Sequence, residues 1–168
     1  MKIAVIYSSK TGNTKKVASA ILEGVGAQAQ LFSVDDEISL DEYDLIFMGF
    51  WVDKGSPDKK ASEFMSKISW KKVAYFVTLG AYPDSQHAKD SLEKGIALLG
   101  EHCEIVDSFI CQGAIDPKLM EWMMTLPEDH PHSPDEKRIK RWEDACNRPD
   151  STDLLHAKEF GNNVIRAL

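Results

Sequence analysis

Two features that would mark a membrane or secreted protein are missing from this sequence. No apolar run approaches the roughly 20 residues of a membrane-spanning helix, and the N-terminus leads directly into a predicted strand. Cysteine is scarce, with three residues in a chain of 168, and no two of them form a CxxC pair. We therefore expect a cytoplasmic protein without a membrane anchor, whose cysteines are reduced and pack as small apolar residues.

Basic residues are also in short supply. The chain has 20 lysines and arginines against 27 aspartates and glutamates, which gives a formal net charge of −7. Because nucleic acids are bound mainly through positive charge, we expect no nucleic-acid partner. An acidic surface favours instead the electrostatic steering of a basic protein partner. Tight His and Cys spacing and nucleophile motifs are lacking, so the sequence nominates neither a metal site nor a catalytic residue.

What the sequence does contain is a regular alternation of apolar strands and amphipathic helices. Five segments have the length and composition of strands: residues 2–7, 29–34, 44–50, 73–78 and 104–111. Apolar residues recur at helical spacing between them. This alternation predicts an α/β fold whose parallel sheet is covered by helices on both faces through right-handed crossovers.

The stretch 116–150 interrupts the alternation. It holds two short helical patterns, separated by a turn rich in proline and histidine. A last amphipathic helix over residues 152–167 then resumes the pattern and is expected to cover the sheet. Because neither a linker composition nor a repeat marks a second domain, we interpret the stretch as a helical insertion within a single domain of residues 1–168.

Glycine is sparse in the loop after the first strand. Residues 8–14 read SSKTGNT, and a helical pattern begins near Lys15. A single glycine does not make the three-glycine dinucleotide fingerprint, and no Gly-Lys pair follows Gly12 as a nucleoside-triphosphate loop requires. Hydroxyls beside the unpaired N–H groups of a helix start suit a single phosphomonoester. The alternative is an ordinary capped turn that binds no ligand.

Two further loops are expected beside this one. Residues 50–55 follow the third strand and residues 79–85 follow the fourth, so both leave the carboxyl edge of the sheet, where α/β proteins bind ligands. Each loop carries an aromatic residue, Trp51 or Tyr82. Ser56, which precedes a proline, is predicted to cap the helix that follows.

With these three loops, the sequence resembles the flavodoxin-like family. The resemblance implies a doubly wound, five-stranded parallel sheet of order 2-1-3-4-5 in a three-layer α/β/α arrangement, and a noncovalently bound FMN. The residues that would bind the FMN phosphate are Ser9, Lys10, Thr11, Gly12, Asn13 and Thr14. Those that would flank the ring are Trp51, Val52, Lys54 and Gly55 in the second loop, and Leu79, Gly80, Ala81, Tyr82 and Asp84 in the third.

The resemblance also implies roles for single residues. Tyr82 lies where the family stacks an aromatic ring on the flavin, and Trp51 is the candidate for the opposite face. Gly55 can adopt the positive φ of the family's turn beside flavin N5. Two lysines depart from the family: Lys10 adds a cation to the phosphate loop, and Lys54 places one near the ring, which would raise the reduction potential of the flavin.

Three functions follow from this interpretation. The first is an electron carrier that passes electrons from a reductase to a partner redox enzyme, as a monomer or weak homodimer. The second is an FMN-dependent oxidoreductase that takes hydride from NAD(P)H and reduces a quinone or small organic molecule, with the insertion over the ring. The third is a flavin-free interaction module on the same fold. We take the carrier as the first hypothesis.

Overall fold

The chain folds around one layer of parallel strands, and the computed structural model describes all residues 1–168. The sheet has the order β2-β1-β3-β5-β6, and every neighbouring pair in it is parallel. The strands are β1 (Ile3–Tyr7), β2 (Ala29–Ser33), β3 (Leu45–Asp53), β5 (Lys72–Leu79) and β6 (Glu104–Gln112). The predicted five-stranded order is confirmed, and only the numbering differs, because a two-residue strand, β4 (Ser56–Pro57), pairs with the end of β3.

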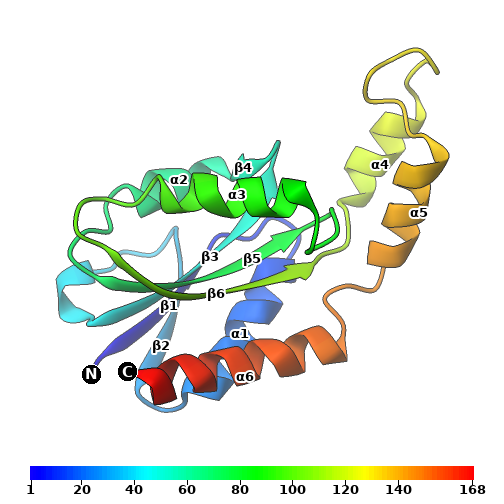
Figure 1. Cartoon of the computed structure of the whole chain (residues 1–168). Coiled ribbons are helices and arrows are strands. Elements are labelled where there is room, and N and C mark those ends of the chain that lie inside the picture. The colour runs from blue at the N-terminus through cyan, green and yellow to red at the C-terminus, as the bar shows by residue number, and fades with distance from the viewer.

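Helices cover both faces of the sheet. One face carries α1 (Asn13–Val25) and α6 (Ser151–Ala167), and the other carries α2 (Lys59–Met65) and α3 (Gln86–Ile96) (Figure 1). The predicted three-layer α/β/α arrangement is therefore confirmed. No helix reaches the length and apolar character that crossing a bilayer would require.

Side chains of the central strands alternate between two apolar cores. Ile3 and Val5 of β1 are fully buried in the core under α1 and α6, whereas Ala4 and Ile6 are fully buried in the core under α2 and α3. Burial on both faces explains why this strand is apolar throughout. Each large side chain so buried stabilises the fold by about 1.5–3 kcal/mol. The two cores thereby fix the strand ends from which the loops of the site emerge.

Helices α1 and α6 approach each other so closely that their contact requires glycine. A Cβ added to Gly24 would lie 2.0 Å from the backbone oxygen of Lys158, and one added to Gly161 would lie 2.7 Å from that of Ile21. Backbone atoms cannot rotate aside as the end of a flexible side chain can. This close packing holds α1, whose N-terminus faces the site, against the sheet.

Between β6 and α6, the chain leaves the body of the molecule. Helices α4 (Pro117–Met124) and α5 (Glu136–Ala145) form a hairpin that projects beyond the sheet (Figure 1). Both helices lie in the stretch predicted as an insertion. Only Ala145 is buried in them, whereas Trp122 and Met124 are 49% and 61% exposed. The hairpin therefore adds little to the two apolar cores.

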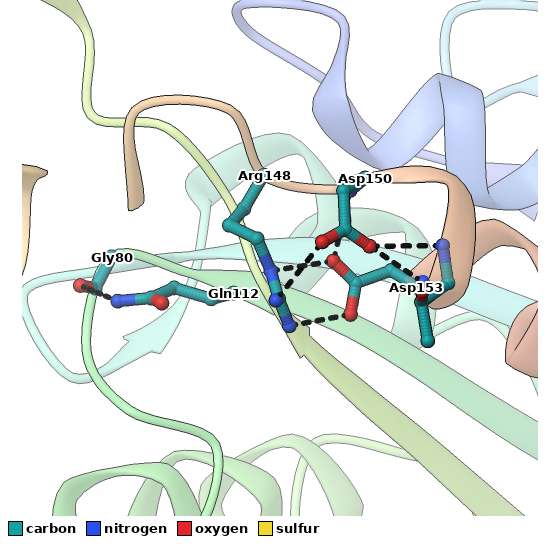
Figure 2. Close-up of polar contacts among 6 residues, drawn as sticks. Gly80, Gln112, Arg148, Asp150 and Asp153 are labelled. Carbon is teal, nitrogen blue, oxygen red and sulfur yellow. Dashed lines mark hydrogen bonds and ion pairs between the residues drawn. The ribbon is translucent and has the colours of Figure 1, made fainter. Parts of the chain in front are cut away.

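An arginine at the base of the hairpin connects it to α6. Arg148 forms ion pairs with Asp153 at 2.7 Å and with Asp150 at 3.2 Å, and both carboxylates belong to the capping box of α6 (Figure 2). The backbone oxygen of Arg148 also accepts a hydrogen bond from the Ala114 N–H at 2.8 Å. The segments entering and leaving the hairpin are thus joined beside the end of β6.

Strand β3 is longer than predicted. It continues to Asp53 instead of ending at Phe50, so Trp51 and Val52 belong to the strand and not to a loop. The additional residues are held by β4 (Ser56–Pro57), which pairs antiparallel with Val52 and Asp53. The strand continues because its edge finds a partner a few residues later in the chain.

A two-residue turn joins β3 to β4. Lys54 and Gly55 have φ angles of 51° and 77°, the combination found in tight hairpins whose twist matches the flanking strands. This hairpin moves the start of the next helix. The predicted cap at Ser56 is wrong, and Asp58 caps α2 by accepting a hydrogen bond from the Ala61 N–H at 3.2 Å.

Candidate functional site

A cleft of about 540 Å³, including its open mouth, lies at the carboxyl edge of the sheet. The sequence-predicted residues in its wall are Ser9, Lys10, Thr11, Asn13, Thr14, Trp51, Val52, Leu79 and Gly80. The wall residues that sequence reasoning missed are Thr78, Gly113, Ala114, Ile115, Asp116 and Leu119. The structure therefore brings the first loop together with the ends of β3 and β5, as the topology of a parallel sheet requires.

The first turn of α1 faces this cleft without a side-chain cap. Gly12 precedes the helix with a φ of 96°, and no side chain accepts a hydrogen bond from the N–H groups of that turn. Each of the other five α-helices begins with an Asp or Ser that accepts such a bond. Helix α1 also has no acidic residue in its first turn. Its N–H groups and its dipole thus favour an external anion.

Side chains within the cleft fix the shape of the first loop. Thr14 Oγ1 and Thr78 Oγ1 share a buried hydrogen bond of 2.8 Å, and Asn13 Nδ2 donates to the Ala114 oxygen at 3.0 Å. Thr14 is only 1% exposed, whereas Thr11 is exposed. Thr14 and Asn13 therefore shape the loop through their side chains, whereas Thr11 is an exposed residue of the cleft wall.

A buried carboxyl group links the first loop to α2. Ser8 Oγ donates a hydrogen bond of 2.7 Å to Oδ1 of Asp58, which is 3% exposed. Burial raises the pKa of Asp58, and the hydrogen bonds from Ser8 and from the Ala61 N–H act in the opposite direction. This link places the start of the first loop relative to α2 on one face of the sheet.

One lysine lies between two walls of the cleft. The Lys10 Nζ is 3.0 Å from Oδ2 of Asp116 and 5.8 Å from the centre of the Trp51 ring. Asp116 is the residue that caps α4, with its Oδ1 accepting from the Lys118 N–H at 3.0 Å. The hydrogen bond from Lys10 holds the pKa of Asp116 below its ordinary value. Lys10 therefore connects the first loop to the base of the hairpin.

The third loop is held by residues on β6 and α5. Gln112 Nε2 donates to the Gly80 oxygen at 3.3 Å (Figure 2). Tyr82 Oη donates to Oδ2 of Asp144 at 2.8 Å, and Tyr82 remains 40% exposed. The hydrogen bond to Asp144 is the main reason that the pKa of Tyr82 is raised. The tyrosine ring is thus anchored to the hairpin beside the cleft and is not part of its wall.

Several predicted residues lie outside the cleft wall: Gly12, Lys54, Gly55, Ala81, Tyr82 and Asp84. Lys54 and Gly55 form the turn between β3 and β4, and the chain then continues into α2. A Cβ added to Gly55 would lie 3.2 Å from the His87 ring, so α3 packs against this turn. The roles of these residues toward a flavin ring stay predictions.

Most of the wall residues that the sequence did not predict come directly after β6 in the chain. Because β6 is parallel to the other strands, its carboxyl end lies at the same edge, and Gly113 could have been nominated by the rule that found the other loops. Asp116 and Leu119 could not, because their place depends on how the insertion is oriented. No local pattern in the sequence encodes that orientation.

Solved structures with the same fold include two flavoproteins. Oxidised flavodoxin 1 from Bacillus cereus has a TM-score of 0.61 at 19% identity, with coverage of 100% of this chain and 99% of that chain. A flavoprotein in complex with FMN from Lactobacillus acidophilus NCFM has a TM-score of 0.51 at 19% identity, with coverage of 65% of this chain and 92% of that chain. At such identities, the likeness is one of fold.

Comparisons of sequence show more than a shared fold. The flavodoxin-like domain-containing protein BilS of Clostridioides difficile is 33% identical over 172 residues, which cover 98% of this chain and 97% of the relative. A family model described as the flavodoxin domain matches residues 4–162. Because that match spans nearly the entire sheet and its helices, the chain belongs to the flavodoxin domain family.

Proposed function

We propose that the protein binds FMN noncovalently in the cleft and passes electrons from a reductase to an acceptor enzyme. The observation that carries this proposal is the uncapped first turn of α1, which follows Gly12 and faces the cleft. Each of the other five α-helices has a capping Asp or Ser that accepts a hydrogen bond from an N–H group of its first turn. A phosphate supplies the missing acceptor, and the helix dipole adds to its binding.

The residues of the cleft fit a phosphorylated flavin. Ser9 and Thr11 would donate hydroxyl hydrogen bonds to the phosphate, together with the backbone amides at the start of α1. Trp51 offers a flat apolar surface for the ring. The acid in the wall, Asp116, is paired with Lys10 and so does not present an uncompensated negative charge. Flavoproteins with this fold, one of them solved with FMN, support the same choice of cofactor.

When bound, FMN supplies reversible uptake and release of electrons, and the protein supplies binding, orientation and exclusion of water. Thr14 and Asn13 keep the phosphate loop in one shape through their bonds to Thr78 and Ala114. Lys10 holds a positive charge between the Trp51 ring and Asp116. A fixed positive charge and the cleft wall influence how easily the bound flavin accepts an electron, and so its reduction potential.

One observation favours a second candidate function, that of an FMN-dependent NAD(P)H oxidoreductase acting on a quinone or small organic molecule. Ile115 and Leu119, which precede and begin the hairpin, contribute apolar wall to the cleft. Leu119 is 40% exposed, so this wall keeps accessible apolar surface. A second flat apolar molecule would find contact there.

The two functions differ in their need for a separate reductase. The purified protein is incubated with FMN, freed of excess and mixed anaerobically with NADH or NADPH. A carrier keeps its yellow colour until a flavodoxin reductase is added, and an oxidoreductase loses it at once. A folded protein that fails to retain FMN supplied in excess contradicts both functions and leaves a flavin-free interaction module.

A further inference from the structure

Lys10 is the only cation in the cleft wall, and it is engaged by an acid of the same wall. Its Nζ lies 3.0 Å from Oδ2 of Asp116, and the side chains are 56% and 17% exposed. The lysine is therefore open to water, whereas the carboxylate is more covered, and water weakens the attraction between them. Lys10 belongs to the loop whose backbone favours an anion. Its ammonium can therefore be attracted both to Asp116 and to an anion bound at that loop.

Asp116 is fixed in place independently of Lys10. It caps α4, and its Oδ1 accepts a hydrogen bond from the Lys118 N–H at 3.0 Å, while Oδ2 faces Lys10. Asp116 therefore keeps its position when the lysine moves. Lys10, by contrast, is a flexible side chain whose ammonium can turn from one anion to another.

A phosphate bound at the first turn of α1 would bring up to two negative charges to the same loop. Both anions then attract the same ammonium, and the contact with Asp116 at 3.0 Å opposes any movement of Lys10 towards that phosphate. We propose that Asp116 competes with the flavin phosphate for Lys10, and so limits how strongly the cleft prefers FMN over riboflavin. This inference rests on the proposed function, because it requires that the cleft bind flavins.

The competition has a signature that simple repulsion lacks. If Asp116 acts by retaining Lys10, neutralising the acid strengthens phosphate binding only while Lys10 is present. If Asp116 merely repels the phosphate through space, the gain persists without the lysine. The sign is also informative, because an acid that positions Lys10 productively would, when removed, weaken phosphate binding.

The test compares two flavins that differ only in the phosphate. Apoprotein is titrated with FMN and with riboflavin at low ionic strength, and binding is followed by quenching of flavin fluorescence. The variants are Asp116→Asn, Lys10→Met and the double variant. Asparagine is a good helix cap, so Asp116→Asn is expected to preserve α4. Glu121→Gln on α4 is the matched control, because Glu121 is exposed and makes no ion pair.

We expect Asp116→Asn to tighten FMN about three- to fivefold and to change riboflavin less than twofold. Lys10→Met should weaken FMN about tenfold, and Asp116→Asn should bring no gain in the Lys10→Met background. Glu121→Gln should leave both affinities unchanged. Three results overturn the inference: weaker FMN binding by Asp116→Asn, an equal shift for riboflavin, or a gain that persists without Lys10. Failure of the unmodified protein to bind either flavin would instead refute the proposed function itself.

Discussion

Tyr82 in the third loop donates a hydrogen bond from its Oη to Oδ2 of Asp144 in α5, at 2.8 Å. The two residues are far apart in the sequence, and the bond connects the hairpin to a loop at the carboxyl edge of the sheet. Asp144 also pairs with Lys140 one turn earlier in α5, and both contacts lower the pKa of Asp144, that with Lys140 most. With the Lys10–Asp116 pair, the hairpin is tied to two loops of the site.

The first prediction concerns this tie. Tyr82→Phe removes the hydroxyl but keeps the ring and leaves the Lys140–Asp144 pair intact. Because few buried contacts hold α5, we expect backbone hydrogen exchange in α5 to become several-fold faster, with little change in α1. Hydrogen exchange followed by mass spectrometry measures both. Glu143→Gln, at an exposed position without an ion pair, is the control, and equal acceleration in it would contradict a specific role for Tyr82.

Acid should loosen the same contact. The pKa of Asp144 is lowered in the folded protein, so its contribution to stability is present above the ordinary Asp pKa and is lost as the pH falls through the lowered value. The Tyr82→Phe variant and the unmodified protein should therefore converge in α5 protection at strongly acidic pH. A difference that grows on acidification would exclude this origin.

A second prediction tests the phosphate loop. Thr11 is exposed at the cleft, whereas Thr14 is buried against Thr78, so a charge can be placed at position 11 without disturbing the core. Thr11→Asp puts a carboxylate beside the expected phosphate and should weaken FMN at least about tenfold through like-charge repulsion. Thr11→Asn, of similar size but neutral, should retain most of the affinity. Titration with FMN measures both, and equal affinities would place the phosphate elsewhere.

The contrast between positions 11 and 14 shows where sequence reasoning ends. The loop and its place at the carboxyl edge follow from local periodicity and the topology of parallel sheets, whereas the strand order comes from the resemblance to the flavodoxin-like family. Thr14 is buried and forms a hydrogen bond with Thr78, whereas Thr11 is exposed. Only the folded sheet brings Thr78 next to this loop. In the same way, the resemblance to the flavodoxin-like family implies Tyr82 at a flavin face, but its partner Asp144 lies on an insertion with no predictable orientation.

The prediction for residues 50–56 was wrong for a different reason. The Lys54-Gly55 turn carries a recognisable signal, a glycine in the second position of a two-residue hairpin. The proline after Ser56 is typical of the first residue of a helix, but proline is also tolerated in a short edge strand such as β4. Local preference alone did not separate these alternatives, and pairing with β3 decided between them.

A third prediction concerns the packing that holds α1. Helix propensity alone would make Gly24→Ala stabilising by up to about 1 kcal/mol. The added Cβ would lie 2.0 Å from the Lys158 backbone oxygen, however, and forcing the helices apart costs about 1–3 kcal/mol or more. We expect a net loss in the free energy of unfolding, measured in urea. Lys16→Ala, at an exposed position of the same helix, should stay within about 0.5 kcal/mol, and a stabilised Gly24→Ala would refute the contact.

The last prediction uses the buried carboxyl group of Asp58. Burial raises its pKa, so the folded protein binds this proton more readily than the unfolded chain does. The acid is therefore most favourable to folding below the ordinary Asp pKa, and its contribution falls as the pH rises from there through the raised value. Asp58→Asn removes the titration while keeping an oxygen that can accept from Ser8 and cap α2.

Urea unfolding of both proteins across pH 4 to 8 tests this sign. The stability of the unmodified protein relative to Asp58→Asn should decline as the pH rises and then level off. Asp41→Asn, at an exposed position, reports the effect of losing a carboxylate that is not buried. A relative stability that rises with pH would mean that Ser8 and the N–H groups of α2 stabilise the charged form more than burial penalises it. In that case the link between the phosphate loop and α2 would be an ionic cap, and the loop would be held most firmly when Asp58 is charged.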